Sequence, residues 1–280
     1  MTTNSFFGDS ETQFIIIDSV QIAYRKFGNG TPILFYNRFR GILDTWDPLF
    51  LDSLATDHSI VLFDYPGIGD SDGELSSDIL EVANVGIKLM TCLTYEKFYV
   101  LGWSYGGLVA QAAMFLNEDK VLKTVLIGTN PPGNNDTSFD PAFFERALKP
   151  INDLDDETVI FFEPTSEKSR IAAKASFDRI SRKLNSSKIP STPDKFQKYF
   201  NGSALMKKDE ENFRGRYETL TIPVLVISAD HDISFAVENW FPLLRKAPSM
   251  QHIILNDAGH GLQHQEPKLM AGYINLFLNN

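Results

Sequence analysis

Residues 97–116 read KFYVLGWSYGGLVAQAAMFL, and this stretch decides the fold. It opens with an apolar run, 97–101, that is typical of a buried strand, and closes with an amphipathic run, 108–116, that is typical of a helix. Between them, Gly102-Trp103-Ser104-Tyr105-Gly106 matches the G-x-S-x-G pattern of a tight turn that exposes a serine hydroxyl. The flanking glycines lack side chains, so neighbouring backbone can approach closely. The stretch predicts Ser104 as a nucleophile; the alternative is an ordinary helix-capping serine.

Apolar runs alternate with helix-like stretches on both sides of this turn. Buried strands are predicted at 32–36, 59–63, 97–101, 121–127, 223–228 and 250–255, and helices at 46–55, 78–93, 104–117, 235–246 and 262–278. Two further runs, 13–18 and 20–26, predict an antiparallel pair at one edge of the sheet. Buried strands that alternate with helices indicate an α/β fold, with a mostly parallel central sheet and helices on both of its faces.

The alternation stops between residues 131 and 216. This segment contains helix-like stretches such as 167–184, loops with Pro, Asn and Asp, and many phenylalanines, but no strong strand signal. We therefore expect a helical cap at 131–216, inserted into a single sheet domain that is formed by 1–130 and 217–280.

Composition narrows the possible partners. The chain has 280 residues and a formal net charge of −10, and an acidic surface repels both nucleic acid and anionic membranes. No apolar run is long enough to span a bilayer, and residues 1–10 lack the pattern of a secretory signal. We expect a cytoplasmic monomer or homodimer whose partner is a small-molecule substrate. The only cysteine, Cys92, lies in a predicted helix and is expected to be a buried packing residue.

A nucleophilic serine needs a general base, because its hydroxyl is protonated near neutral pH. Among five histidines, His260 lies in a glycine-flanked loop, 257–261, that follows the last predicted strand. Loops at the carboxyl ends of parallel strands are where such sheets collect their functional residues. His260 is therefore predicted as the base. The acid that orients it should follow the preceding strand, where Asp230 and Asp232 both stand, and the spacing alone does not choose between them.

A metal site is a second interpretation of the same region. His260 and His264 stand four residues apart, with Asp230 and Asp232 nearby. However, the chain contains no H-E-x-x-H motif, and this histidine pair would straddle a boundary between a loop and a helix. We expect neither a metal nor a cofactor.

Taken together, these residues resemble the α/β-hydrolase fold family, in its capped, cofactor-free, esterase-like branch. Besides the turn at Ser104 and the His260 loop, residues 63–71 (FDYPGIGDS) resemble the family's D-x-P-G-x-G-x-S turn. In this family the strand before the acid often ends in G-x-x-D, and residues 229–232 match with alanine in place of glycine. The resemblance implies Asp232 as the acid of a Ser-His-Asp triad.

The resemblance also implies two backbone N–H groups that stabilise a developing oxyanion. One belongs to Tyr105, directly after the nucleophile. The other normally comes from a loop with the pattern His-Gly-aromatic, but this chain has Asn37 and Arg38 where His-Gly is usual. Phe39 then takes the donor position.

The arginines of this loop allow two interpretations. Arg38 or Arg40 would suit a substrate carboxylate, because guanidinium groups bind carboxylates with paired hydrogen bonds. The plainer interpretation is that both are solvated loop side chains. Trp103, next to the nucleophile, is a further candidate for contact with a substrate.

The sequence thus predicts a carboxylesterase-like serine hydrolase. It would cleave an ester, lactone or similar acyl bond of a small, largely apolar molecule through an acyl-enzyme on Ser104. Two alternatives stay open. One is a carbon–carbon bond hydrolase of the same fold. The other is a non-catalytic small-molecule sensor, for which the altered loop at Asn37 and Arg38 is the only support.

Overall fold

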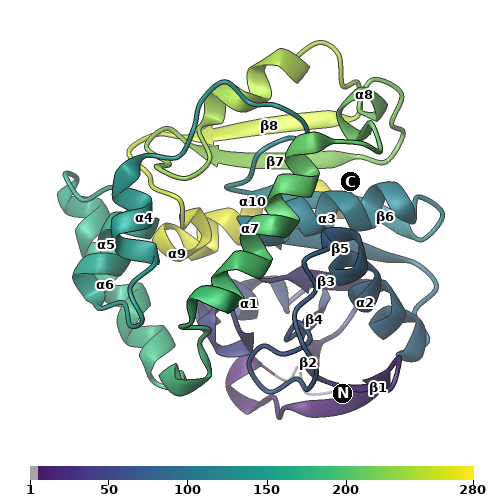
Figure 1. Cartoon of the computed structure of the whole chain (residues 1–280), viewed down its shortest axis with the longest axis horizontal. Coiled ribbons are helices and arrows are strands. Elements are labelled where there is room, and N and C mark those ends of the chain that lie inside the picture. The colour runs from purple at the N-terminus through teal and green to yellow at the C-terminus, as the bar shows by residue number, and fades with distance from the viewer. Residues whose placement is uncertain (1–5) are drawn as a thin grey trace.

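Eight strands form one sheet in the computed structural model, which describes residues 6–280 (Figure 1). The strands are β1 Gln13–Ile17, β2 Val20–Gly28, β3 Pro32–Tyr36, β4 Ser59–Phe63, β5 Phe98–Trp103, β6 Val121–Ile127, β7 Val224–Ala229 and β8 Met250–Leu255. Their order is β1-β2-β4-β3-β5-β6-β7-β8. Strand β2 is antiparallel to both neighbours, and all other pairs are parallel. The predicted α/β fold, with its antiparallel pair at the edge, is confirmed. Residues 1–5, part of the segment predicted not to be a secretory signal, lie outside the described residues.

Helices cover both faces of this sheet. Those that follow or precede the parallel strands are α1 Pro48–Leu54, α2 Ile79–Cys92, α3 Tyr105–Leu116, α9 Leu262–Gln265 and α10 Pro267–Asn279. Alternate residues along β3 enter two different apolar cores, one built with α1 and α10 and the other with α2 and α3. The side chains of a strand alternate between the faces of the sheet, so a strand that is apolar at every position needs a helix on each side.

The segment between residues 131 and 216 is helical, as its composition predicts. Its elements are α4 Pro141–Ala147, α5 Leu154–Phe161, α6 Glu167–Ser181, the 3₁₀ helix η3 Ser186–Lys188, α7 Pro193–Lys208 and α8 Phe213–Arg216. Figure 1 shows α4, α5 and α6 grouped at one side of the sheet, while α7 crosses in front of it. We call residues 131–216 the helical segment; its standing as a separate domain stays a prediction. No helix among the described residues is both long and apolar enough to cross a membrane.

Prolines shorten two of the predicted helices. The region predicted as a helix at 235–246 forms only a 3₁₀ helix, η4 Val237–Leu243, with Pro242 inside it. The last predicted helix is divided into α9 and α10 at Pro267. Proline has no N–H to donate and disfavours the α conformation of the residue before it, so an α-helix does not run through either position.

The prediction that Cys92 is buried is wrong. Cys92 is exposed at the last residue of α2. The buried face of α2 is formed by Ile79, Val82, Ala83, Gly86, Ile87, Leu89 and Met90. Cys92 follows this set on the opposite side of the helix, where apolar character is not required.

Candidate active site

Ser104 lies in the turn between β5 and α3, with φ 61° and ψ −125°. A residue with a side chain rarely adopts such a backbone conformation, which costs about 1–3 kcal/mol. Close backbone packing holds the turn. A Cβ atom added to Gly102 would collide with the carbonyl of Gly106, and one added to Gly106 would collide with the carbonyl of Tyr36. The two glycines of the motif are therefore needed for the reason that the sequence suggests.

His260 and Asp232 form a buried pair at the carboxyl ends of β8 and β7. The Nδ1 atom of His260 lies 2.8 Å from Oδ2 of Asp232. The other oxygen of Asp232 accepts hydrogen bonds from the N–H groups of Ser234 at 2.7 Å and Phe235 at 2.9 Å. These bonds fix the carboxylate, so that it can orient the imidazole and stabilise its protonated form.

Asp230, the alternative acid, has different partners. Its carboxylate contacts Nδ1 of His231 at 2.7 Å and accepts hydrogen bonds from the N–H groups of Asp257 and Ala258. Asp230 therefore braces the loop that carries His260. The structure brings Asp232, and not Asp230, to the imidazole.

Gly128, at the end of β6, completes the support of this pair. Its φ is +48°, and an added Cβ atom would lie 3.0 Å from Nδ1 of His260 and 3.3 Å from Oδ2 of Asp232. Only glycine combines this backbone conformation with so close an approach. Sequence reasoning missed Gly128, although a glycine directly after a buried strand is a recognisable signal.

Ser104 and His260 open onto the same small cavity, of about 20 Å³. Its lining consists of Arg38, Phe39, Arg40, Ser104, Phe143, Ala147, Asn152, Ile160, Phe161 and His260. Half of these residues come from the helical segment, which sequence reasoning did not resolve to individual residues. The described contacts include no hydrogen bond between the side chains of Ser104 and His260; such bonds often form only when a substrate is in place.

Of the two predicted oxyanion donors, Phe39 lines this cavity and Tyr105 directly follows Ser104, which lines it. Tyr105 is the first residue of α3, so its N–H has no acceptor within the helix. Phe39 lines the cavity, and its N–H donates to no acceptor among the described contacts. The ring of Phe39 packs against Phe196, Tyr199 and Phe200 of α7, with centroid distances of 5.3, 5.1 and 5.6 Å. These contacts fix the loop from the side of the helical segment.

Asn37, at the position where histidine is usual, holds the same loop from the side of the sheet. Its Nδ2 donates to the carbonyl of Phe63 at 2.8 Å, and its Oδ1 accepts from the indole N–H of Trp46 at 2.7 Å. The hydroxyl of Tyr65 donates to the Asn37 carbonyl. Asn37 is fully buried, so the altered loop is a firmly anchored one.

Arg40 is not a solvated side chain, which corrects the plainer interpretation of this loop. It is only 3% exposed. Its guanidinium donates to the carbonyls of Ala147, Lys149, Pro150 and Pro190 and to the side-chain oxygen of Asn152, at 2.6–2.9 Å. These acceptors all lie in the helical segment. The guanidinium therefore joins the loop to that segment, and we leave Arg40 out of the proposed substrate contacts.

Arg38 is half-buried beside the nucleophile and has few partners. Its guanidinium lies 4.7 Å from the ring centroid of Phe161 and 5.4 Å from that of Trp103. One nitrogen donates to the Phe39 carbonyl at 2.7 Å, whereas the buried Nε has no hydrogen-bond partner among the described residues. Burial lowers the pKa of Arg38 to about 10, so it remains positively charged at neutral pH.

Trp103 lies behind the histidine rather than at the cavity. It is 1% exposed, and its indole N–H donates to the His260 carbonyl at 3.0 Å. Its ring packs against those of His260 and His264. Trp103 thus supports the histidine loop. It does not line the cavity at Ser104, where the sequence suggested a contact with a substrate.

The residues of the metal interpretation lie in ordinary environments. His264 is buried against Trp103, with Nδ1 3.3 Å from the hydroxyl of Ser176, and burial lowers its pKa to about 3.

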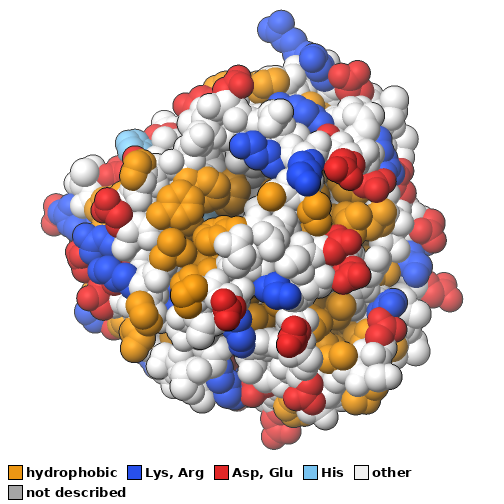
Figure 2. Space-filling view, viewed as in Figure 1, with side chains coloured by type: hydrophobic (Ala, Val, Ile, Leu, Met, Phe, Trp, Pro, Cys, Tyr) orange, Lys and Arg blue, Asp and Glu red, His pale blue; other side chains and the backbone are white. Residues whose placement is uncertain are grey.

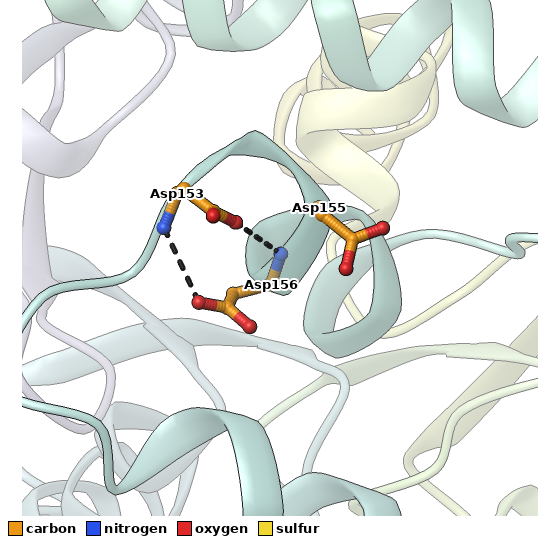
Figure 3. Close-up of side chains that lie close together, drawn as sticks. All are labelled: Asp153, Asp155 and Asp156. Carbon is orange, nitrogen blue, oxygen red and sulfur yellow. Dashed lines mark hydrogen bonds between the residues drawn. The ribbon is translucent and has the colours of Figure 1, made fainter.

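A separate group of carboxylates, Asp153, Asp155 and Asp156, lies at the start of α5 (Figure 3). Helix capping and ion pairs with Arg146 and Lys149 account for these carboxylates.

Two larger cavities, each of about 240 Å³, lie under or beside the helical segment. One shares Arg38, Arg40, Asn152 and Phe161 with the small cavity at Ser104. The other lies between α7 and residues 130–139 and is largely apolar. On the face seen in Figure 2, hydrophobic side chains gather around a hollow between α4 and α7.

A family model described as alpha/beta hydrolase fold matches residues 31–267. The chain belongs to the α/β-hydrolase fold family. The predicted family is thereby confirmed, and so is the predicted fold. The triad, the acyl-enzyme and the bond that is cleaved stay predictions.

Known relatives and solved structures extend this result. The dihydrolipoyllysine-residue acetyltransferase component of an acetoin cleaving system from Cupriavidus necator is 34% identical over 152 residues, which are 51% of this chain. This chain spans only 40% of that relative's length, and 41% of the length of a second curated relative. A 2-hydroxy-6-oxononadienedioate/2-hydroxy-6-oxononatrienedioate hydrolase from Cupriavidus pinatubonensis is 24% identical over 81% of this chain and 78% of its own length.

The structure of an alpha/beta hydrolase fold protein from Chitinophaga pinensis superimposes with a TM-score of 0.86. The superposition covers 99% of this chain and 100% of that protein, at 24% identity. This likeness shows that the fold is shared over the part of the chain that the structure describes, the helical segment included.

Proposed function

We propose that this chain is a serine hydrolase that cleaves an ester, lactone or similar acyl bond of a small, largely apolar molecule. One observation carries the proposal. The strained Ser104 and the Asp232-bound His260 open onto the same cavity. A serine with positive backbone φ and a buried, carboxylate-bound imidazole are both costly to form, and their meeting at one cavity is what nucleophilic catalysis requires.

The mechanism follows from the placement of five groups. Ser104 Oγ attacks the acyl carbon while His260 removes its proton, and Asp232 stabilises the imidazolium that forms. The N–H groups of Tyr105 and Phe39 bind the oxyanion of the tetrahedral intermediate. His260 then protonates the leaving group, and the acyl group remains on Ser104. A water molecule, deprotonated by His260, releases the acid and restores the enzyme. The chain supplies every group, so the proposed reaction needs no cofactor.

The helical segment serves in this proposal as the cap predicted at 131–216. It supplies Phe143, Ile160 and Phe161 to the wall of the cavity at Ser104. The apolar cavity next to α7 includes Phe139, and the ring of Phe139 lies 5.1 Å from that of Phe143. These contacts support an apolar leaving group or acyl chain on that side.

Labelling with a fluorophosphonate probe tests the proposal. The native protein should be labelled covalently, and the Ser104→Ala variant should not. Ser191, exposed just before α7, offers the matched control Ser191→Ala, which should be labelled like the wild type. Equal labelling of wild type and Ser104→Ala would refute Ser104 as the nucleophile, and no labelling of either would favour the non-catalytic sensor.

Hydrolysis of a carbon–carbon bond is the second candidate. It is favoured by the relative from Cupriavidus pinatubonensis, which matches about four fifths of both chains. That relative is named as a hydrolase of 2-hydroxy-6-oxononadienedioate and 2-hydroxy-6-oxononatrienedioate. A panel of aryl esters and vinylogous diketo acids separates the two. Turnover of simple aryl esters supports the esterase, whereas turnover of the diketo acids alone supports the carbon–carbon hydrolase.

A further inference from the structure

A cavity with a positively charged wall adjoins the nucleophile. It has a volume of about 240 Å³ and lies between the loop after β3 and helices α5 and α6. Arg38 and Phe161 line both this cavity and the small one at Ser104. One substrate molecule can therefore place a group against Arg38 in the larger cavity and the bond to be cleaved at Ser104.

The charges that line this cavity do not balance. Arg38 and Arg40 each carry one positive charge, and Glu157 is the only acidic residue in the lining. The net charge is +1 when Glu157 is ionised. Burial raises the pKa of Glu157, and its protonated form would leave +2. The cavity is thus positive in either state, although the whole chain has a net charge of −10.

Arg38 is the cation that is free to bind a ligand. The donors of Arg40 are already committed to five acceptors of the helical segment, whereas within residues 6–280 the Arg38 side chain makes one hydrogen bond, to the Phe39 carbonyl. The Nε of Arg38 is buried with no acceptor among the described residues. A buried donor without a partner costs about 1–3 kcal/mol, and an incoming acceptor removes that cost.

We propose that this cavity binds a carboxylate group of the substrate and that Arg38 is its main partner. The inference rests on the proposed hydrolase function and specifies the substrate class. The acyl portion carries a carboxylate a few bonds from the bond that is cleaved. The rest of the wall suits the intervening methylene groups, because Phe177, Leu184 and Ile189 are apolar. One negative charge matches the net charge of the wall.

Two esters with the same leaving group test this directly. They are 4-nitrophenyl butyrate and mono-4-nitrophenyl glutarate, which differ chiefly by a terminal carboxylate. The quantity to measure is the ratio of kcat/KM for the glutarate ester to that for the butyrate ester. Arg38→Gln should lower this ratio at least tenfold, because hydrogen bonds to charged groups contribute about 1.5–3 kcal/mol.

Glu157→Gln supplies a test in the opposite direction. It removes the only negative charge of the wall, so the ratio should rise about threefold or more. Lys174→Gln removes a positive charge from the exposed face of α6 and should leave the ratio unchanged. General damage to the site would lower the ratio, or leave it unchanged, in both Arg38→Gln and Glu157→Gln. Opposite shifts are therefore expected only from electrostatic recognition, and a ratio that stays within twofold in Arg38→Gln overturns the proposal.

A binding measurement separates this inference from the proposed function. Calorimetry with 5-phenylpentanoate uses Ser104→Ala protein, in which no acyl-enzyme can form. Binding to this variant should weaken at least tenfold when Arg38→Gln is added. If the ligand binds in an Arg38-dependent way while Ser104 is never labelled by the probe, the hydrolase proposal fails and the carboxylate site stands. If Ser104 is labelled but binding does not depend on Arg38, the carboxylate site fails and the hydrolase proposal stands.

Discussion

The two aspartates after β7 are two residues apart, yet their surroundings differ. Asp232 is buried against the imidazole of His260, and Asp230 lies at the surface of the loop, paired with His231. Strand β7 ends at Ala229, so both aspartates lie in the turn that follows, where strand alternation no longer places residues i and i+2 on one face. Sequence spacing left both aspartates as candidates, because the geometry of the turn, and not the residue type, decides which carboxylate meets the imidazole.

Replacing each aspartate distinguishes their roles. Asp232→Asn should lower kcat for an activated ester about a thousandfold or more, because the amide favours the wrong tautomer of His260 and cannot stabilise its charge. Asp230→Asn should lower kcat less than tenfold. Steady-state kinetics on both variants checks this, with circular dichroism to confirm folding. A larger loss in Asp230→Asn than in Asp232→Asn would place the acid at Asp230.

Among the elements, the loop after β3 shows how the helical segment and the sheet depend on each other. Its backbone is tied to the sheet through Asn37 and to the helical segment through Arg40. The donor position at Phe39 lies between these two ties. The loop is therefore rigid without the glycine that is usual at the position of Arg38.

Removing the guanidinium of Arg40 should weaken this connection strongly. Arg40→Met leaves several buried carbonyl groups without a donor, and we expect the free energy of unfolding to fall by about 3 kcal/mol or more. Arg170→Met is the matched control, since Arg170 is exposed on α6 and donates to a single carbonyl. Its effect should stay within about 0.5 kcal/mol. Urea unfolding measures both, and equal losses would contradict the structural role of Arg40.

Local patterns predicted the strands and the helical character of residues 131–216, but not the contacts between that segment and the loop after β3. Apolar runs marked every strand within two residues of its bounds, because burial on both faces leaves a strong signal in the sequence. The partners of Arg40 lie 107 to 150 residues further along the chain. No local pattern encodes such contacts, so the sequence suggested only a substrate contact or a solvated side chain for Arg40. The position of Gly128 against His260 depends on β6, β7 and β8 together and was missed for the same reason.

At the scale of the whole molecule, the free energy of unfolding should depend on pH through buried titratable groups. Burial lowers the pKa of His264 to about 3, against an ordinary value of 6.5. Between these values the unfolded chain binds a proton at His264 that the folded protein does not bind. The stability that neutral His264 provides is therefore fully present above pH 6.5 and is lost as the pH falls toward 3. Asp64, whose pKa burial raises to about 7, acts in the opposite direction, since its contribution is lost as the pH rises from 3.8 to 7.

A comparison of variants isolates the contribution of His264. The difference in unfolding free energy between wild type and His264→Asn should shrink by up to about 1.4 kcal/mol per pH unit between pH 6.5 and 4. Urea titrations at several pH values measure it. The exposed His231 provides a control, because His231→Gln should leave the steep acid-side loss in place. Parallel curves for wild type and His264→Asn would show that His264 is not buried as a neutral side chain.

The hydrogen bonds of Arg40 also limit how a substrate could reach Ser104 and how a product could leave. A lid that swung away as a rigid body would have to break five bonds of one guanidinium and would pull on the backbone next to Phe39. Each turnover of the proposed reaction would then displace the proposed oxyanion donor at Phe39. Figure 2 shows a hollow between α4 and α7, and in the proposed hydrolase we expect substrate and product to pass there while the helices stay docked. The width of a fixed opening, and not the rate of a hinge motion, would then limit the size of substrate that the proposed hydrolase admits.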